Sequence, residues 1–284
     1  MDRAPTGLSS ETWAEETLRR LGQAEGFVPG DLTDGALALA VFDAPSDRVD
    51  FYRDHIGKLC SDLATVLEPG ATAEAAREAL SHVLYGLHGY SGDQETYDDL
   101  QNANLIRVID RRKGLPVALG ILMIDLARSA GLAMDGLDFP GHFLLRLDVG
   151  GERMIIDPFH TGVALDAAAL RGLLKLTSGA DAELHPDHYE PTADRDILLR
   201  LQNNIKLRLI KAQRVDQAIG IVESMLLLAP DRAVLWREAG MMNAHIGNVK
   251  SALSALETYI DREERAAPRQ EAEGVIAELR ARLN

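Results

Sequence analysis

A histidine and an aspartate are the residues of this 284-residue chain best placed for acid–base chemistry. His142 opens a stretch that alternates apolar and polar residues, and Asp157 closes the next such stretch. Between them, Gly150-Gly151 has the composition of a two-residue hairpin turn. A carboxylate that stabilises a charged imidazole allows the histidine to exchange protons near neutral pH. The pattern therefore nominates His142 and Asp157 as a candidate catalytic pair.

The register of this hairpin decides whether the two side chains can meet. With a two-residue turn, Val149 pairs with Glu152, and counting outward brings Leu144 opposite Asp157. One face of the hairpin is then apolar, and His142 and Asp157 are diagonal neighbours on the other face. A slip of one residue would move Asp157 to the opposite face, so the register tests the hypothesis.

An apolar helix precedes the hairpin and must pack against it. Pro116 suits the first position of a helix, where its missing N–H would have no partner. Gly131 suits the position just after the last turn of the helix, where the backbone needs a left-handed conformation. Apolar residues between them cover most of the circumference, which predicts a helix buried on most sides. A buried helix on a small antiparallel sheet defines an α+β domain.

The C-terminal third is predicted to be helical throughout and contains a repeat. Ala218 and Ala252 lie 34 residues apart, which is the tetratricopeptide period. The family's Trp, Gly, Gly, Ala and Leu positions in the second unit are filled by Trp236, Gly240, Gly247, Ala252 and Leu256. Such arrays need about three units for independent stability, so these helices should pack on the preceding domain.

Three segments follow from these patterns. Residues 1–45 are predicted to form an N-terminal extension with one short helix, and residues 46–190 form the α+β domain. Residues 191–284 form an all-α array of tetratricopeptide-like hairpins.

Three ordered motifs, together with the repeat, resemble one known family. They are residues 102–119, the run Phe139-Pro140-Gly141-His142-Phe143-Leu144, and Ile156-Asp157-Pro158-Phe159. The chain resembles the bacterial transglutaminase-like family with C-terminal tetratricopeptide repeats, often labelled regulator of SirC, over roughly residues 45–265. The resemblance implies a papain/transglutaminase-like first domain. In the wider superfamily a Gly-x-Cys opens the central helix, followed by His and Asp on neighbouring strands.

The resemblance places a proline where active relatives carry their nucleophile. Gly114-Leu115-Pro116 aligns with Gly-x-Cys, and proline is usual in this subfamily. In active relatives a thiolate attacks, stabilised by the helix N-terminus and the histidine. Proline has no nucleophilic atom, so thiol catalysis at Pro116 is excluded. Cys60, the only cysteine, lies on the apolar stripe of another predicted helix and is expected to be inert.

The motifs before the central helix and beside His142 contain three candidate binding residues. Asn102 either caps its helix or contacts a ligand. Arg112 either pairs with a carboxylate such as Asp157 or binds a carboxylate of a partner peptide. Gly141 belongs to the histidine's motif and is counted among the candidate binding residues.

A basic stretch at the start of the repeats gives two further candidates. Arg208 and Lys211 stand there with Arg200, Lys206 and Arg214. These cations either pair with the acidic first domain or dock an acidic peptide, because tetratricopeptide hairpins expose a concave groove.

Composition excludes several classes of function. A net charge of −14 argues against binding to nucleic acid or to anionic membranes. The longest apolar stretch, Leu115–Ile124, is about half of a membrane span. The single cysteine and the absence of an apolar signal region near Met1 predict a cytoplasmic protein. His185-x-x-His188 lacks further ligands, so no metal or cofactor is expected.

Two functions fit these observations, besides a pure scaffold in which the cavity is filled and only the repeats are used. The first is a non-catalytic regulatory protein, a pseudoenzyme that binds a protein or peptide partner, with its oligomeric state left open. The second is a hydrolase of amide or ester bonds in which His142 and Asp157 activate water. The hydrolase requires an open cavity over His142.

Overall fold

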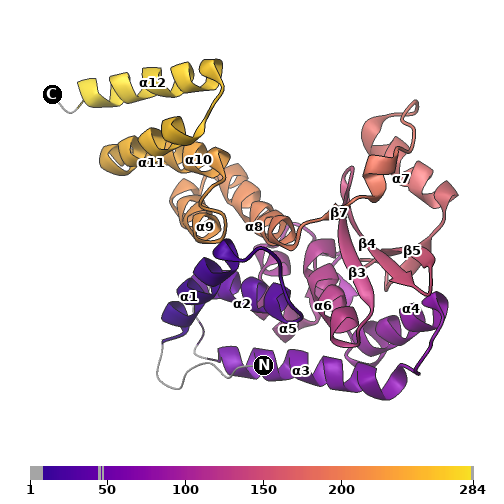
Figure 1. The fold of residues 1–284 in the computed structure, drawn as a ribbon. Helices are drawn as coiled ribbons and strands as arrows, with labels where there is room; N and C mark the ends of the chain where they lie inside the picture. Colours follow the sequence, from indigo (N-terminus) through magenta and orange to yellow (C-terminus); the bar gives the residue numbers. More distant parts are fainter. Residues whose placement is uncertain (1–8, 44–45, 47, 283–284) are drawn as a thin grey trace.

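A small antiparallel sheet with helices on both faces forms the first part of the molecule, and a row of antiparallel helices forms the second (Figure 1). The computed structural model describes residues 9–43, 46 and 48–282. The main sheet has five strands in the order β6-β5-β4-β3-β7. Their bounds are β3 Ala133–Phe139, β4 His142–Val149, β5 Glu152–Asp157, β6 Val163–Leu165 and β7 Pro191–Thr192. A separate parallel pair joins β1 (Ser91–Gly92) to β2 (Lys113–Gly114).

The predicted hairpin register is confirmed. Strands β4 and β5 pair from Val149 with Glu152 through to Leu145 with Ile156. Both turn glycines have positive φ, the backbone conformation that a tight two-residue turn requires. Continuing the same count brings Leu144 opposite Asp157.

Helix α6 (Pro116–Ser129) is the buried central helix that the sequence predicts. Pro116 occupies its first turn, and Gly131 follows its end with φ +76°. Every residue from Val117 to Ala127 is buried. One face of the sheet packs on α6, and α7 (Ala167–Ser178) covers part of the other with Leu170 and Leu174. The face of the sheet that packs on α7 is therefore less polar than the alternation of apolar and polar residues in the sequence indicated.

The N-terminal extension contains a helix that the sequence analysis missed. Besides α1 (Ser10–Gln23), the chain forms α2 (Asp31–Asp43), which is buried nearly all round. Asp125 of α6 accepts hydrogen bonds from the amides of Gly30 (3.2 Å) and Thr33 (2.9 Å) at the start of α2. Burial raises the pKa of Asp125, although these hydrogen bonds oppose the change. The carboxyl group thus joins the two most buried helices.

The other helical elements complete the first domain and build the array. Those of the first domain are α3 Val49–Val66, α4 Ala73–Ser81, η1 His82–Leu87, η2 Leu100–Ala103, α5 Leu105–Arg111 and η3 Pro186–Tyr189. Those of the array are α8 Asp194–Lys211, α9 Val215–Leu228, α10 Ala233–His245, α11 Val249–Arg262 and α12 Ala266–Ala281.

The repeat helices pack on the first domain. Ala218 and Ala252 are fully buried, in agreement with the predicted need for small residues there. One continuous hydrophobic core includes Leu37 of α2, Leu122 of α6 and Leu198 of α8. This core crosses the predicted boundaries near residues 45 and 190, so neither coincides with a break in packing. Within the described part of the chain, no helix has both the length and the apolar composition to cross a membrane.

Gly120 allows α6 to approach the sheet closely, and this generates a stability prediction. A Cβ at Gly120 would lie 2.5 Å from Cε1 of Phe143. We expect Gly120→Ala to lower the free energy of unfolding by about 1–3 kcal/mol, because a packed core resists added volume. Urea unfolding followed by circular dichroism measures the change.

The matched control is Gly220→Ala in α9, where an added Cβ meets nothing within 4 Å. Alanine should stabilise that helix by up to about 1 kcal/mol through its higher helix propensity. Equal effects at the two glycines would contradict the close approach of α6 to the sheet.

Candidate functional site

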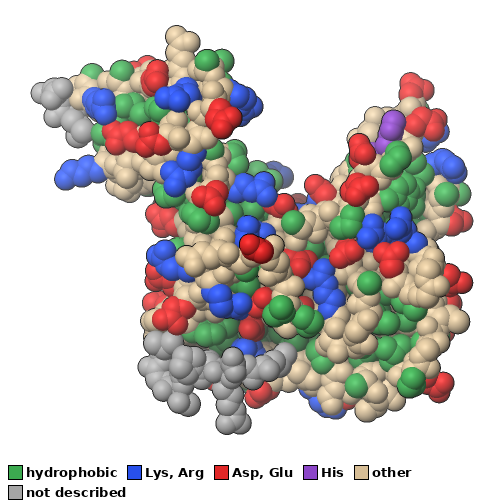
Figure 2. All heavy atoms as spheres, in the orientation of Figure 1, with side chains coloured by type: hydrophobic (Ala, Val, Ile, Leu, Met, Phe, Trp, Pro, Cys, Tyr) green, Lys and Arg blue, Asp and Glu red, His purple; other side chains and the backbone are tan. Residues whose placement is uncertain are grey.

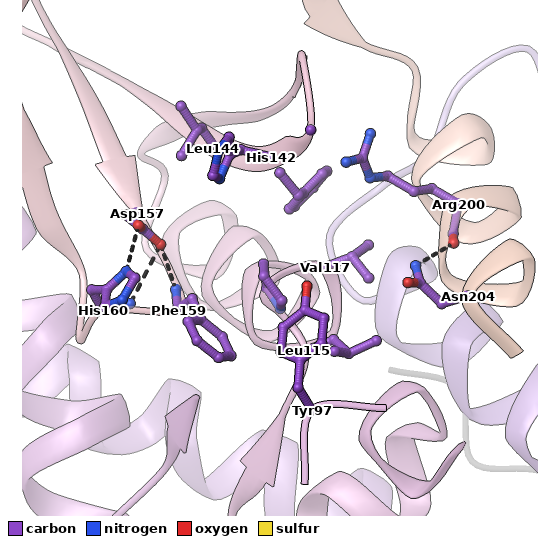
Figure 3. A pocket seen from close by; sticks show the side chains of 13 residues that line it. Tyr97, Leu115, Val117, His142, Leu144, Asp157, Phe159, His160, Arg200 and Asn204 are labelled. Carbon is purple, nitrogen blue, oxygen red and sulfur yellow. Dashed lines mark hydrogen bonds and ion pairs between the residues drawn. The ribbon is translucent and has the colours of Figure 1, made fainter. Parts of the chain in front are cut away.

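A cavity of about 220 Å³ lies where the N-terminus of α6, the sheet and α8 meet. Its lining residues are Tyr97, Leu115, Pro116, Val117, Gly141, His142, Phe143, Leu144, Asp157, Phe159, His160, Arg200 and Asn204. Four of the predicted site residues are therefore brought together: Pro116, Gly141, His142 and Asp157. Figure 3 shows Asp157 and His160 on one side of the cavity, Arg200 and Asn204 on the opposite side, and His142 above.

The turn between β3 and β4 positions His142. Gly141 adopts φ +73°, and a side chain there would collide with Thr177 of α7. His142 follows as the first residue of β4, paired with Phe139, and its half-buried ring lies 6.4 Å from the ring of that residue. Gly141 thus serves the backbone geometry that points the imidazole into the cavity.

Asp157 is paired with a different histidine from the one predicted. Its Oδ2 lies 2.7 Å from Nδ1 of His160, and its Oδ1 accepts from the backbone amides of Phe159 (2.8 Å) and His160 (3.3 Å). Among the described residues, the His142 imidazole makes no hydrogen bond to Asp157. His142 and Asp157, the predicted candidate pair, both line the cavity, but the histidine bonded to Asp157 is His160.

Local geometry explains this change of partner. The strand ends at Asp157, and an aspartate readily accepts from N–H groups two and three residues further on. That turn places His160 beside the carboxylate. Since Nδ1 faces Asp157, the other ring nitrogen is left for the solvent or a ligand, and the side chain is 58% exposed. The Asp-x-x-His spacing after a strand was the available sequence signal.

The repeat region supplies one wall of the cavity, which the sequence analysis did not foresee. Arg200 and Asn204 reach the cavity from α8. The Arg200 guanidinium lies 5.6 Å from the centre of the Phe143 ring and pairs with Asp138 of β3. Asn204 donates to the carbonyl of Arg200 (2.9 Å).

Of the two basic candidates, Arg208 contacts the first domain and Lys211 is exposed. Arg208 forms an ion pair with Asp98 (3.1 Å) and donates to the carbonyl of Tyr97 (3.3 Å). Tyr97 lines the cavity, so Arg208 holds one of its edges in place. This is the pairing with the acidic first domain that was one of the two alternatives.

Asn102 stabilises the loop beneath the cavity rather than capping a helix. It is fully buried, donates to the carbonyl of Thr96 (2.6 Å) and accepts from Arg111 (2.9 Å). The helix cap predicted for Asn102 is wrong, because Asn104 accepts from the first turn of α5. The backbone carbonyl of Asn102 accepts from Leu115 (2.9 Å), next to Pro116.

Beside it, Asp93 anchors the same loop. Burial disfavours its charge, but hydrogen bonds from Thr96 and Arg111 outweigh that cost and hold the pKa of Asp93 well below its usual value.

Arg112 lies outside the cavity, in a cluster with His55 and Tyr90. It adopts a left-handed conformation with φ 58°. Its guanidinium donates to the Tyr90 hydroxyl (2.5 Å) and to Nε2 of His55 (2.6 Å). The expected contact with Asp157 is therefore wrong. Burial and the nearby charges of Arg112 and His88 lower the pKa of His55 to about 4.

Two remaining side-chain expectations concern Cys60 and the histidine pair. Cys60 is half-buried, and burial raises the pKa of its thiol, as suits an unreactive cysteine. His188 lies in the short helix η3 and His185 precedes it; the amide of His185 donates to Nδ1 of His188 (3.0 Å). In the described ranges, no three His, Cys, Asp or Glu residues are grouped as a metal site.

This architecture defines a class: a transglutaminase-like domain joined to tetratricopeptide helices. Comparisons with known proteins agree. Residues 50–203 match the description "Transglutaminase-like superfamily", and residues 205–284 match "Tetratricopeptide repeat". The chain belongs to the transglutaminase-like superfamily and, within it, to the bacterial family of UPF0162 proteins; it is also similar to Protein SirB1.

Three relatives illustrate the match. A UPF0162 protein of Xylella fastidiosa is 30% identical over 235 residues, covering 81% of this chain and 83% of its own. A UPF0162 protein of Vibrio cholerae is 30% identical over 84% of this chain and 88% of its own. Protein SirB1 of Salmonella typhimurium is 23% identical over 86% and 90%. Among solved structures, menin aligns with 96% of this chain and 75% of its own, with a TM-score of 0.42 and 8% identity.

The His55 cluster generates a prediction about pH. The folded-state pKa of about 4 lies below the usual 6.5, so the unfolded state binds the proton first as the pH falls. The neutral His55 imidazole therefore contributes fully to the stability of the folded state above pH 6.5, and this contribution is lost as the pH falls towards 4. His55→Gln keeps an acceptor for Arg112 but does not titrate. Urea unfolding at pH 7 and pH 5 should show a smaller loss of stability in the variant than in the wild type.

An exposed histidine provides the control. His245→Gln at the exposed end of α10 is compared in the same way, to show whether the change depends on the cluster rather than on the loss of any histidine. If His55→Gln and the wild type lose stability equally between pH 7 and pH 5, the cluster does not hold His55 neutral.

Proposed function

We propose that this protein is a non-catalytic regulatory protein of the bacterial cytoplasm that binds a peptide segment of a protein partner. The observation that carries the proposal is an open cavity with His142 in its wall and Pro116 at the nucleophile's position. Among the described residues that line it there is no cysteine, serine or threonine. The cavity has the polar and aromatic groups of a binding site but none of the thiol or aliphatic hydroxyl groups of Cys, Ser or Thr.

A second cavity supports binding of an extended ligand. It measures about 730 Å³ and lies between α8, α10 and the edge formed by β7. The space-filling view shows the molecule hollowed between the repeat helices and the part of the first domain that carries α7 (Figure 2). Tetratricopeptide hairpins commonly bind peptides on their concave side. A segment in this groove would approach the His142 cavity.

The proposal predicts binding without turnover. An array of N-acetylated, C-amidated octapeptides of mixed sequence should yield peptides that bind the wild type. His142→Ala should weaken the binding of these peptides about fivefold, because one polar side chain that lines the cavity is lost. Mass spectrometry should show no cleavage of the bound peptides or of a glutamyl-lysine isopeptide. Fluorescence anisotropy measures the affinity.

His185→Ala is the matched control, since this exposed histidine does not line either cavity. It should bind as the wild type does. Turnover of any peptide or isopeptide that His142→Ala abolishes would refute the non-catalytic function.

One observation favours hydrolysis as a second candidate function. The Asp157–His160 pair resembles a water-activating dyad, with the second ring nitrogen free. That nitrogen would take a proton from water while the oxygen bonds to a carbonyl carbon, and the leaving group would depart with the proton. His160 would then take the role predicted for His142.

The hydrolytic candidate makes a separate prediction. Esters such as p-nitrophenyl acetate should be hydrolysed faster by the wild type than by His160→Asn, by about 100-fold if His160 is the base. Identical rates for wild type and variant would remove this candidate.

A further inference from the structure

Arg200 lines both cavities, so it stands at their junction. It extends from α8 towards the side of the cavity that carries His142 (Figure 3). A ligand that occupied the groove of the repeats and the His142 cavity together would pass this guanidinium. The chemistry of Arg200 therefore bears on what the ligand must carry.

The Arg200 guanidinium has donors to spare. It carries five N–H groups in a planar fork, which suits a carboxylate held by two parallel hydrogen bonds. Among the described residues its polar partner is Asp138, and the face of the guanidinium lies over Phe143. Burial lowers the pKa of Arg200, which reflects a guanidinium that has lost part of its hydration.

Comparison with the other cations of the groove singles out Arg200. Lys206 pairs with Glu238 (2.6 Å) and Arg232 pairs with Asp196 (2.5 Å). The side chains of these two acids are 35% and 37% exposed, whereas that of Asp138 is 68% exposed. Exposed ion pairs contribute little free energy, so Asp138 is the partner that a ligand displaces most readily.

The His142 cavity itself favours a negative or neutral group. Asp157, its acidic lining residue, already accepts three hydrogen bonds from His160 and Phe159. The groups left to meet a ligand are the imidazoles of His142 and His160, the Arg200 guanidinium and the aromatic rings of Tyr97 and Phe159.

We infer that Arg200 recognises an acidic side chain of the bound peptide, which replaces Asp138. An apolar or aromatic neighbour of that residue fills the His142 cavity, and the remaining peptide lies along α8 and α10. The carboxylate comes from a side chain rather than from a chain end, because a ligand in both cavities continues past Arg200 on both sides. This inference rests on the proposed peptide-binding function.

The test uses twin peptides. Each N-acetylated, C-amidated octapeptide of the array is made once with Glu at a central position and once with Gln. Peptides that bind should prefer the Glu form about tenfold, as expected for loss of a charge-assisted hydrogen-bonded pair. Arg200→Gln should abolish this preference, and Arg200→Lys should restore only part of it. Fluorescence anisotropy gives the dissociation constants.

The variant Asp138→Asn should change the affinity for the Glu peptides in the opposite direction. Removing the internal competitor should strengthen binding of the Glu peptides and leave the Gln peptides unchanged. The matched control is Arg237→Gln in α10, which pairs with Glu271 and lines neither cavity, and it should bind as the wild type does.

The outcomes separate the two proposals. Equal binding of the Glu and Gln twins, or weaker binding by Asp138→Asn, overturns the role of Arg200 and leaves peptide binding standing. The same octapeptides are also made with a free C-terminal carboxylate; if only this form binds, the anion lies at the chain end and the inference is overturned. Binding of no peptide in any form overturns the proposed function itself.

Discussion

The burial of α6 on every side is the constraint on which the rest of the structure depends. A helix with no solvent-facing side must be enclosed, and the sheet, α2, α3 and α8 all pack on it. Its one buried acid, Asp125, needs hydrogen-bond donors, since an unpaired buried carboxyl group would cost several kcal/mol. The start of α2 supplies them through Gly30 and Thr33. Enclosure of one helix thereby fixes elements from the beginning, the middle and the C-terminal third of the chain.

The same constraint keeps the cavity open at a defined place. Because α6 cannot shift, its first residue, Pro116, stays below the strand that carries His142. Proline at the first helical position leaves no amide without a partner and holds φ near its helical value. The N-terminus of the helix, which borders the cavity, is therefore well formed.

Local patterns made much of this fold predictable from the sequence. The turn glycines and the alternation fixed the register of β4 and β5, while Pro116 and Gly131 marked the ends of α6. Helix α2 was missed because its apolar residues surround the helix and give no amphipathic stripe. A pattern of that kind identifies a helix only when its neighbours are known.

The errors at the site came from competition between local and distant partners. Asp157 could bond across the sheet to His142 or along the chain to His160, and the turn after the strand favours the nearer group. Arg112 takes a left-handed conformation that turns its side chain towards Tyr90. Arg200 reaches the cavity only through the packing of α8 on α6, a contact between segments distant in sequence. Spacing within a motif does not encode these choices, because they depend on tertiary structure.

The overall charge limits how an acidic ligand is recognised. With a net charge of −14, the protein as a whole repels an acidic peptide at long range. At physiological salt this field is screened beyond about 8 Å, whereas a partly buried guanidinium acts strongly at contact. Arg200 would therefore contribute to the choice of ligand and to its residence time rather than to the rate of encounter. An array packed on its neighbour is suited to this role, because one rigid core holds the groove and the cavity in fixed relation.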